Sequence, residues 1–313
     1  NPPGASKACI RDWVGGMSLA AATATWSMSD SNVERVSETI SFKMVMTVFD
    51  GILIVTAAIV VLYSVRSVGW YALPQSASTS NRSVPEGFFV FAGLLLLGLL
   101  GQSMTAPLLS EYPITKLEAH TMGLLLGLPM QLALLAVVSR FFPTPPDTNR
   151  ASWSRAIRMG LRGFVPLWLV VVGVATTFSL IRQLIMGQPP DPVGHASLAM
   201  LMESSGWVVP VFVLLVTLAV PFLEEVAFRG LLQPALSRFT GSAWFGVILT
   251  SMLFAMAHWG AVQVEGLPGL FVLGLGLGVL RAKTGRIESA IVVHVLFNLL
   301  NIVLAWISTP ASL

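Results

Sequence analysis

The sequence predicts an all-α fold, a polytopic membrane helix bundle with about eight transmembrane helices. Two observations predict it. Hydrophobic residues make up 55% of the 313 residues and charged residues only 11%, whereas roughly a quarter of a soluble domain is charged. Apolar segments near the ~20 residues that a spanning helix needs also recur along the chain. So few charges cannot cover a soluble globule of this size, and lipid is the expected solvent.

The apolar segments follow a polar start and are separated by loops rich in proline, glycine and serine, such as 73–87, 142–150 and 187–194. These residues interrupt helices and favour turns. Eight segments result: 44–65, 88–107, 119–142, 161–181, 207–232, 243–259, 267–283 and 287–306. Residues 1–41, rich in serine, alanine and threonine, are interpreted as an extramembrane tail.

Basic residues predict the orientation of the bundle. Arginine and lysine concentrate in the connectors after the first, third, fifth and seventh segments, which should therefore face the cytoplasm. Both termini would then be extracytoplasmic. The net charge of +3 suits anionic lipid headgroups, and no nucleic-acid partner is expected. The single cysteine, Cys9, excludes an intramolecular disulfide and a cysteine-based metal site.

Ionisable and amide side chains inside apolar segments are costly and usually functional. Here they gather in the last four segments. They are Glu224, Glu225, Arg229, His258, His294 and Asn298.

Helical spacing separates the two acids. Glu225 and Arg229 are four residues apart, so they share a face and can pair. Glu224 points about 100° away from that face and is free to meet another group. His294 and Asn298 share a face by the same interval. Counted at ~1.5 Å per residue from the predicted cytoplasmic ends, three helices can bring these groups to one buried point.

Such a set can catalyse hydrolysis. A buried glutamate can take a proton from water and return it later, and a histidine can orient that water. A second histidine and an asparagine can donate hydrogen bonds to a developing oxyanion. Alternatively, Glu224, His258 and His294 could ligate Zn²⁺ with a water in the fourth position, although the HExxH pattern is absent. The geometry of the folded site decides between these two alternatives.

Structural alternatives exist for each motif. Glu225 with Arg229 could be only an ion pair, His258 a buried core histidine, and His294 with Asn298 an interhelical hydrogen-bonding pair. The joint occurrence of all three favours a functional site. The two other histidines, His120 and His195, lie without acidic company and are given no role.

At these residues the sequence resembles the CAAX protease and bacteriocin-processing family of intramembrane proteases, also called the Abi family. Its pattern is EExxxR, then FxxxH, then HxxxN or HxxxD. The chain matches it at Glu224-Glu225-xxx-Arg229, Phe254-xxx-His258 and His294-xxx-Asn298. The resemblance covers roughly 200–305. Residues 160–313 are therefore interpreted as the catalytic membrane core and 42–159 as additional N-terminal transmembrane helices.

The resemblance implies an intramembrane endopeptidase that opens toward the cytoplasm. In it, Glu224 and His258 would activate water, His294 and Asn298 would stabilise the oxyanion, and Glu225 with Arg229 would support the site. The family is often labelled metalloprotease, but its residue set also fits a metal-free glutamate mechanism, which is preferred. It implies a peptide or protein substrate, lipidated or membrane-bound, and a location in the bacterial cytoplasmic membrane. Two alternatives stay open from the residues themselves: a transporter or proton relay, and a noncatalytic membrane adaptor.

Overall fold

The computed structural model describes residues 48–63, 73, 82–107, 111–142, 151–187 and 195–308. Nearly all of these residues are helical, and they contain no strand beyond two isolated β-bridges. The predicted all-α fold is therefore confirmed. The predicted extramembrane tail, 1–41, lies outside the described residues.

Among the residues that the structure describes, six helices are long and apolar enough to cross a membrane. They are Val84–Ser103 (α2), Lys116–Phe141 (α4), Trp153–Met186 (α5), Val208–Thr240, Val264–Thr284 and Glu288–Ile307. Two shorter apolar helices, Val48–Tyr63 and Ala243–Ala257 (α10), coincide with the remaining predicted segments. The multi-pass membrane bundle is thus confirmed, whereas by length only six of the eight predicted segments qualify as spans.

Capping residues set where two helices begin, and this is why they start earlier than hydropathy predicted. Before α2, the Ser83 side chain accepts from the Glu86 N–H while the Glu86 carboxylate accepts from the Ser83 N–H, a capping box. Before α5, the Ser152 hydroxyl accepts from the Arg155 N–H. The sequence placed Arg155 in the connector after the third apolar segment, but the structure places it on the first turn of α5.

The helix Val208–Thr240 changes its hydrogen-bonding pattern along its length. It comprises α7 (Val208–Leu214), the π-helical segment η2 (Leu215–Ala219), α8 (Val220–Glu225), the π-helical segment η3 (Val226–Leu232) and α9 (Gln233–Thr240). The paired acids end α8 and lie between the two π-helical segments. Such segments are frequent at functional sites, because each inserts a residue and rotates the side chains that follow.

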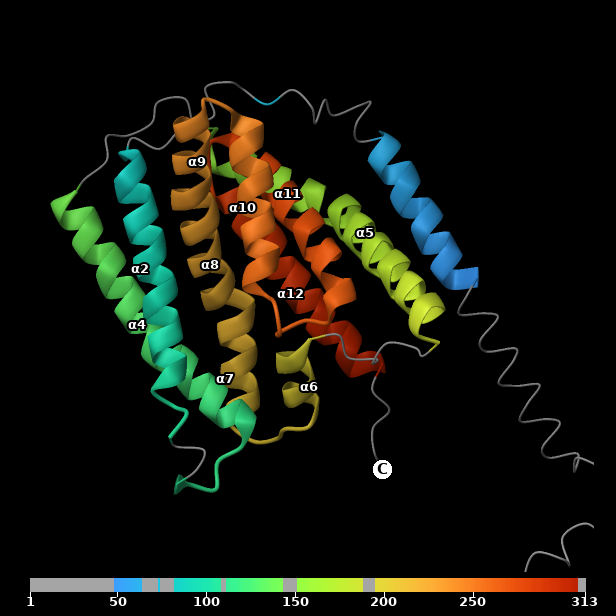
Figure 1. Cartoon of the computed structure of the whole chain (residues 1–313), viewed down its shortest axis with the longest axis horizontal. Coiled ribbons are helices and arrows are strands. Elements are labelled where there is room, and N and C mark those ends of the chain that lie inside the picture. Colours follow the sequence, from blue (N-terminus) through green and yellow to red (C-terminus); the bar gives the residue numbers. More distant parts are fainter. Residues whose placement is uncertain are drawn as a thin grey trace, which may run out of the picture. The chain divides into compact units, whose positions relative to one another are not determined.

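This long helix lies between two groups of helices (Figure 1). On one side, α2 packs against α4 and against η3 and α9. On the other lie α10, α11 (Leu267–Thr284), α12 (Glu288–Ser308) and α5, where α11 contacts both α10 and α5. A short helix, α6 (Ala196–Met202), contacts α12 and α4.

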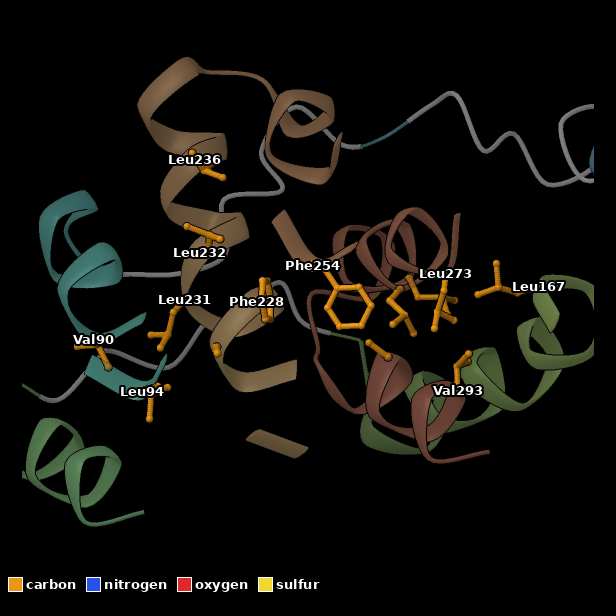
Figure 2. Close-up of a cluster of buried hydrophobic side chains, with 14 of the residues drawn as sticks. Val90, Leu94, Leu167, Phe228, Leu231, Leu232, Leu236, Phe254, Leu273 and Val293 are labelled. Atoms are coloured by element: carbon orange, nitrogen blue, oxygen red, sulfur yellow. The ribbon is translucent and has the colours of Figure 1, made fainter. Parts of the chain in front are cut away.

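The main hydrophobic core runs across these groups, from Val90 and Leu94 of α2 through Phe228 and Phe254 to Leu273 of α11 (Figure 2). Burial of such side chains stabilises the packing. The core surrounds the charged motif, so Glu225 and Arg229 are enclosed by protein and not by lipid.

Glycines let the helices of the core approach closely. A Cβ at Gly274 would lie 2.9 Å from the Ser251 Cβ of α10, and one at Gly276 would overlap the Leu167 side chain of α5. Close approach of this kind is typical of helix packing through small residues.

Candidate active site

Three charged or titratable side chains form the buried centre of the site. Arg229 Nη1 lies 3.3 Å from Glu225 Oε1, and His294 Nδ1 lies 2.9 Å from the same oxygen. Glu225 and Arg229 are 0% exposed and His294 is 3% exposed. The predicted pairing of Glu225 with Arg229 is present. Because a buried charge without a partner is very costly, each member of this chain of contacts requires the next.

Glu224 meets the same histidine from the other side. Its Oε2 lies 3.6 Å from His294 Nε2, and its side chain is 26% exposed. The paired acids thus address opposite nitrogens of one imidazole. Of the two, only Glu224 is accessible to a water or a substrate. Sequence spacing predicted that the acids diverge, but it did not predict that they converge on His294.

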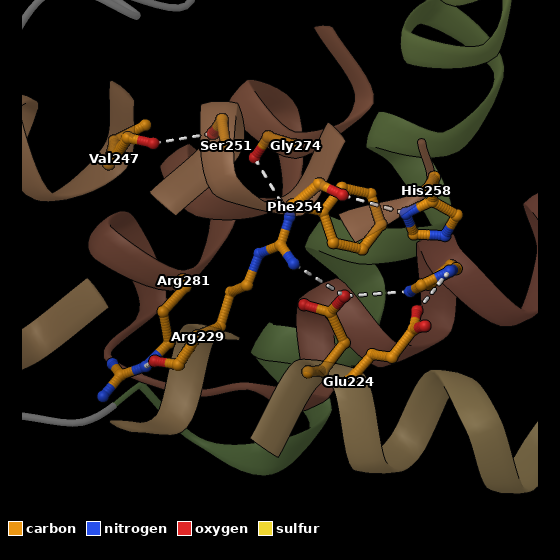
Figure 3. Close-up of polar contacts among 10 residues, drawn as sticks. Glu224, Arg229, Val247, Ser251, Phe254, His258, Gly274 and Arg281 are labelled. Carbon is orange, nitrogen blue, oxygen red and sulfur yellow. Dashed lines mark hydrogen bonds and ion pairs between the residues drawn. The ribbon is translucent and has the colours of Figure 1, made fainter. Parts of the chain in front are cut away.

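Phe254 is the aromatic centre around which the charged groups are arranged. The Arg229 Cζ lies 4.5 Å from the centroid of its ring, a cation–π distance. The rings of His258 and His294 lie 4.8 Å and 5.8 Å from it. Figure 3 shows Arg229 reaching toward Phe254, with His258 on the far side of that ring. The sequence marked Phe254 only as the residue one turn before His258.

His258 follows the last residue of α10 and is oriented by a backbone carbonyl. Its Nδ1 lies 2.8 Å from the Phe254 oxygen. Since a carbonyl only accepts, Nδ1 carries the hydrogen, and Nε2 is the basic nitrogen of the neutral ring. Among the described residues, no hydrogen bond or ion pair joins His258 to Glu224.

The turn that follows His258 is anchored by distant parts of the chain. The His258 carbonyl accepts from the Ala261 and Val262 N–H groups, and the Ala261 carbonyl accepts from Ala196 at 2.9 Å. Val262 pairs with His195 in an isolated bridge. His195, which received no role from the sequence, therefore lies beside this turn. An ion pair of 3.0 Å between Arg182 and Glu265 ties α5 to the residues before α11.

Asn298 lies one turn after His294 on α12 and already has a partner. Its Nδ2 donates to the Val216 carbonyl of η2 at 2.8 Å. An amide nitrogen carries two hydrogens, so one remains for another acceptor. The structure thus holds His294 and Asn298 on one face, as the spacing predicted.

The candidate zinc ligands Glu224, His258 and His294 do not form a metal-binding group in this arrangement. Both nitrogens of His294 face carboxylate oxygens. Within the described ranges, no three histidine, cysteine, aspartate or glutamate side chains are grouped so that they could hold a metal ion. We therefore derive no step through a metal.

The segment that contains this site was compared with known protein families. Residues 206–300 match the model of the Type II CAAX prenyl endopeptidase Rce1-like family. The resemblance predicted from the three motifs is thereby confirmed for this segment, which contains all six candidate residues. Residues 42–159, predicted as additional helices, lie outside it.

The chain is also similar to an Escherichia coli protein described as "Uncharacterized 24.3 kDa protein". The two are 33% identical over 75 residues, which cover 24% of this chain and 35% of the relative. The chain therefore spans about a third of the length of the curated relative that it matches. No solved structure matches the chain.

Proposed function

We propose that the chain is an intramembrane endopeptidase that hydrolyses a peptide bond near the membrane surface. The observation that carries this proposal is the convergence of Glu224 and Glu225 on His294 within the segment that matches the endopeptidase family. A structural ion pair alone would explain Glu225 and Arg229. It would not explain why the partly exposed Glu224 also lies beside His294.

In this proposal Glu224 is the general base and later the general acid. It takes a proton from a water molecule, which attacks the scissile carbonyl carbon, and it returns the proton to the leaving amine as the C–N bond breaks. His258 Nε2, the basic nitrogen of its ring, orients the water. The exposure of Glu224 and the hydrogen bond at His258 Nδ1 support these assignments.

His294 and Asn298 stabilise the oxyanion. His294 Nδ1 lies 2.9 Å from Glu225, and its Nε2 is the atom that would donate to the oxyanion, because its contact with Glu224 is long. Asn298 retains one Nδ2 hydrogen beside the one bound to Val216. Preorganised donors of this kind lower the barrier without reorganisation during the reaction. Glu225 and Arg229 hold His294 in place.

The apolar helices around the site and the family of the matched segment support a proposal on the substrate class. We propose a peptide or protein substrate that is lipidated or membrane-bound, and a location in the bacterial cytoplasmic membrane. Co-expression with candidate membrane and lipidated peptides, read by mass spectrometry, tests this. Glu224→Gln and His258→Ala should abolish cleavage while the protein still inserts and folds. Cleavage that persists in both variants contradicts the proposal and leaves the transporter or adaptor alternatives.

A metal-free mechanism is the second part of the proposal. The chemistry of the residues supports it, because a glutamate and a histidine can activate water without a metal. We expect cleavage to continue at an unchanged rate after exhaustive treatment with a chelator and removal of the chelate. Loss of cleavage that returns only when Zn²⁺ is added would show that a metal is required.

A further inference from the structure

The two π-helical segments on either side of the paired acids share one pattern. At the end of each, an N–H donates to the carbonyl five residues earlier: Val220 to Leu215, and Gln233 to Phe228. In both cases the next residue is a proline, which has no N–H. If this hydrogen-bonding pattern continued by one more residue, the proline would have to donate to the carbonyl five residues before it, and it cannot. Each proline therefore leaves a carbonyl without its main-chain partner, and the carbonyl of Arg229 is buried.

A side chain from another helix donates a hydrogen bond to each of these carbonyls. Five residues before Pro221 is Val216, whose oxygen accepts from Asn298 of α12 at 2.8 Å. Five residues before Pro234 is Arg229, whose oxygen accepts from Arg281 Nε of α11 at 3.2 Å. A carbonyl that has neither a main-chain donor nor water is costly, and these side chains supply the donors that the helix lacks.

The hydrogen bond from Arg281 is made to the backbone of Arg229, whose side chain pairs with Glu225. Arg281 is 5% exposed, and Figure 3 shows its guanidinium beside the backbone of Arg229. The Arg229 side chain in turn lies against the Gly274 carbonyl at 3.4 Å and against Glu225, whose Oε1 binds His294. A shift of the Arg229 backbone therefore moves the support of His294.

We propose that Arg281 is a positioning residue: it supplies the donor that Pro234 lacks and so holds Arg229 and Glu225 against His294. Arg281 lies within the matched segment but outside the three motifs, and it contacts none of the proposed reacting atoms. The inference rests on the proposed function, since positioning of His294 matters to the reaction only if His294 takes part in it.

A suppressor experiment tests this proposal. Arg281→Met removes the donor and keeps much of the side-chain volume, and we expect kcat to fall about tenfold with KM nearly unchanged. Pro234→Ala restores a main-chain N–H, so adding it to Arg281→Met should return most of the lost kcat. The matched control is Pro221→Ala with Arg281→Met, which restores an N–H at the wrong turn and should rescue nothing.

A spectroscopic measurement keeps the test independent of cleavage. The chain has four histidines, so ¹⁵N-histidine labelling gives four imidazole signal sets that single substitutions can assign. Arg281→Met should shift the His294 signals and leave those of His120 unchanged, and Pro234→Ala should reverse the shift. If no substrate is cleaved by the wild type, the proposed function fails but these signals still decide the positioning role.

Several results would overturn the inference. One is an unchanged His294 signal in Arg281→Met, and another is equal rescue by Pro234→Ala and Pro221→Ala. If Arg281→Met does not fold, the folded yield of its combination with Pro234→Ala decides the matter. Recovery of folded protein by the cognate proline alone supports the proposal, and equal failure of both combinations overturns it.

Discussion

Adjacent residues of one type have different surroundings in this protein, and Glu224 and Glu225 show it most clearly. Glu225 is fully enclosed and touches both Arg229 and His294, whereas Glu224 is partly open and touches only the far nitrogen of His294. One residue of helical rotation produces this division. The enclosed acid is suited to hold the site together and the open acid to exchange a proton.

This division predicts that the same substitution, glutamate to glutamine, mainly lowers stability at Glu225 and mainly abolishes cleavage at Glu224. Glu225→Gln leaves the buried Arg229 without its counter-charge, so we expect a loss of about 3–5 kcal/mol in the free energy of unfolding. Glu224→Gln should change the free energy of unfolding by less than about 1 kcal/mol while abolishing cleavage. Unfolding in detergent by denaturant, followed by circular dichroism, measures both variants. Similar losses of stability would contradict the division of roles.

His195 gives the protein a pH dependence that the sequence did not suggest. Burial, and after it the nearby His258 and His120, lower the pKa of His195 from its ordinary value to about 4. Its neutral Nδ1 accepts from the Ser197 N–H at the start of α6. The unfolded chain therefore binds a proton near pH 6.5 that the folded chain takes up only near pH 4.

Stability should consequently be full above about pH 6.5 and should fall as the pH is lowered toward 4. His195→Asn keeps an N-cap acceptor but does not titrate. We expect this variant to lose less stability than the wild type between these pH values, measured as the unfolding midpoint at each pH. Parallel curves for the two proteins would show that His195 does not contribute. Ser204→Ala, two residues after the end of α6, is a control that should follow the wild type.

Among the helices, α11 shows how one element can serve three neighbours. Its glycines face α10 and α5 at separations that exclude a methyl group, and its Gly274 and Gly278 carbonyls accept from Arg229 and Gln233 of the long helix. The contacts at four-residue intervals on both helices keep the two backbones in register. A small-residue stripe thus aligns the charged motif as well as packing the helices.

Two glycine substitutions test this packing. A Cβ at Gly274 would lie 2.9 Å from the Ser251 Cβ, so Gly274→Ala should lower the free energy of unfolding by about 1–3 kcal/mol. At Gly230 the nearest atom to a new Cβ is 3.7 Å away, so Gly230→Ala should be tolerated. Denaturant unfolding of both variants in the same detergent gives the comparison. Equal losses would mean that close approach at Gly274 is not the cause.

Considered as a whole, the described part of the chain joins the matched segment to residues outside it. Ala196 and Arg182 lie before residue 206, yet both anchor the residues that follow His258. The site is therefore completed by parts of the chain that the family model does not include. Their contacts explain why α6, although only seven residues long, is ordered beside α12 and α4.

The membrane orientation is predicted by the basic residues and can be tested by labelling. Phe239, near the end of α9, and Glu111, before α4, are both exposed. Each is replaced by cysteine in a variant that carries Cys9→Ser. A membrane-impermeant thiol reagent should label Phe239→Cys only from the cytoplasmic side and Glu111→Cys only from the opposite side. The reverse pattern would place the basic ends outside the cytoplasm.

The helical class, the positions of the apolar segments, the six candidate residues and the pairing of Glu225 with Arg229 all followed from the sequence. Hydropathy and a spacing of four residues depend on local geometry, which an α-helix of any length repeats. Helix starts were less accurate, because the caps at Ser83 and Ser152 are polar and fall outside an apolar run. Local rules therefore suffice for segments and faces.

The convergence of both acids on His294, the contacts of Phe254 with both histidines, and the roles of Arg281 and Ala196 came only with the folded arrangement. These contacts join residues far apart in the chain, so they depend on how each helix is rotated and shifted against its neighbours. The π-helical segments change that rotation on both sides of Glu224. A rule based on 3.6 residues per turn does not predict which way side chains point beyond a π-helical segment. Packing between helices determines those directions.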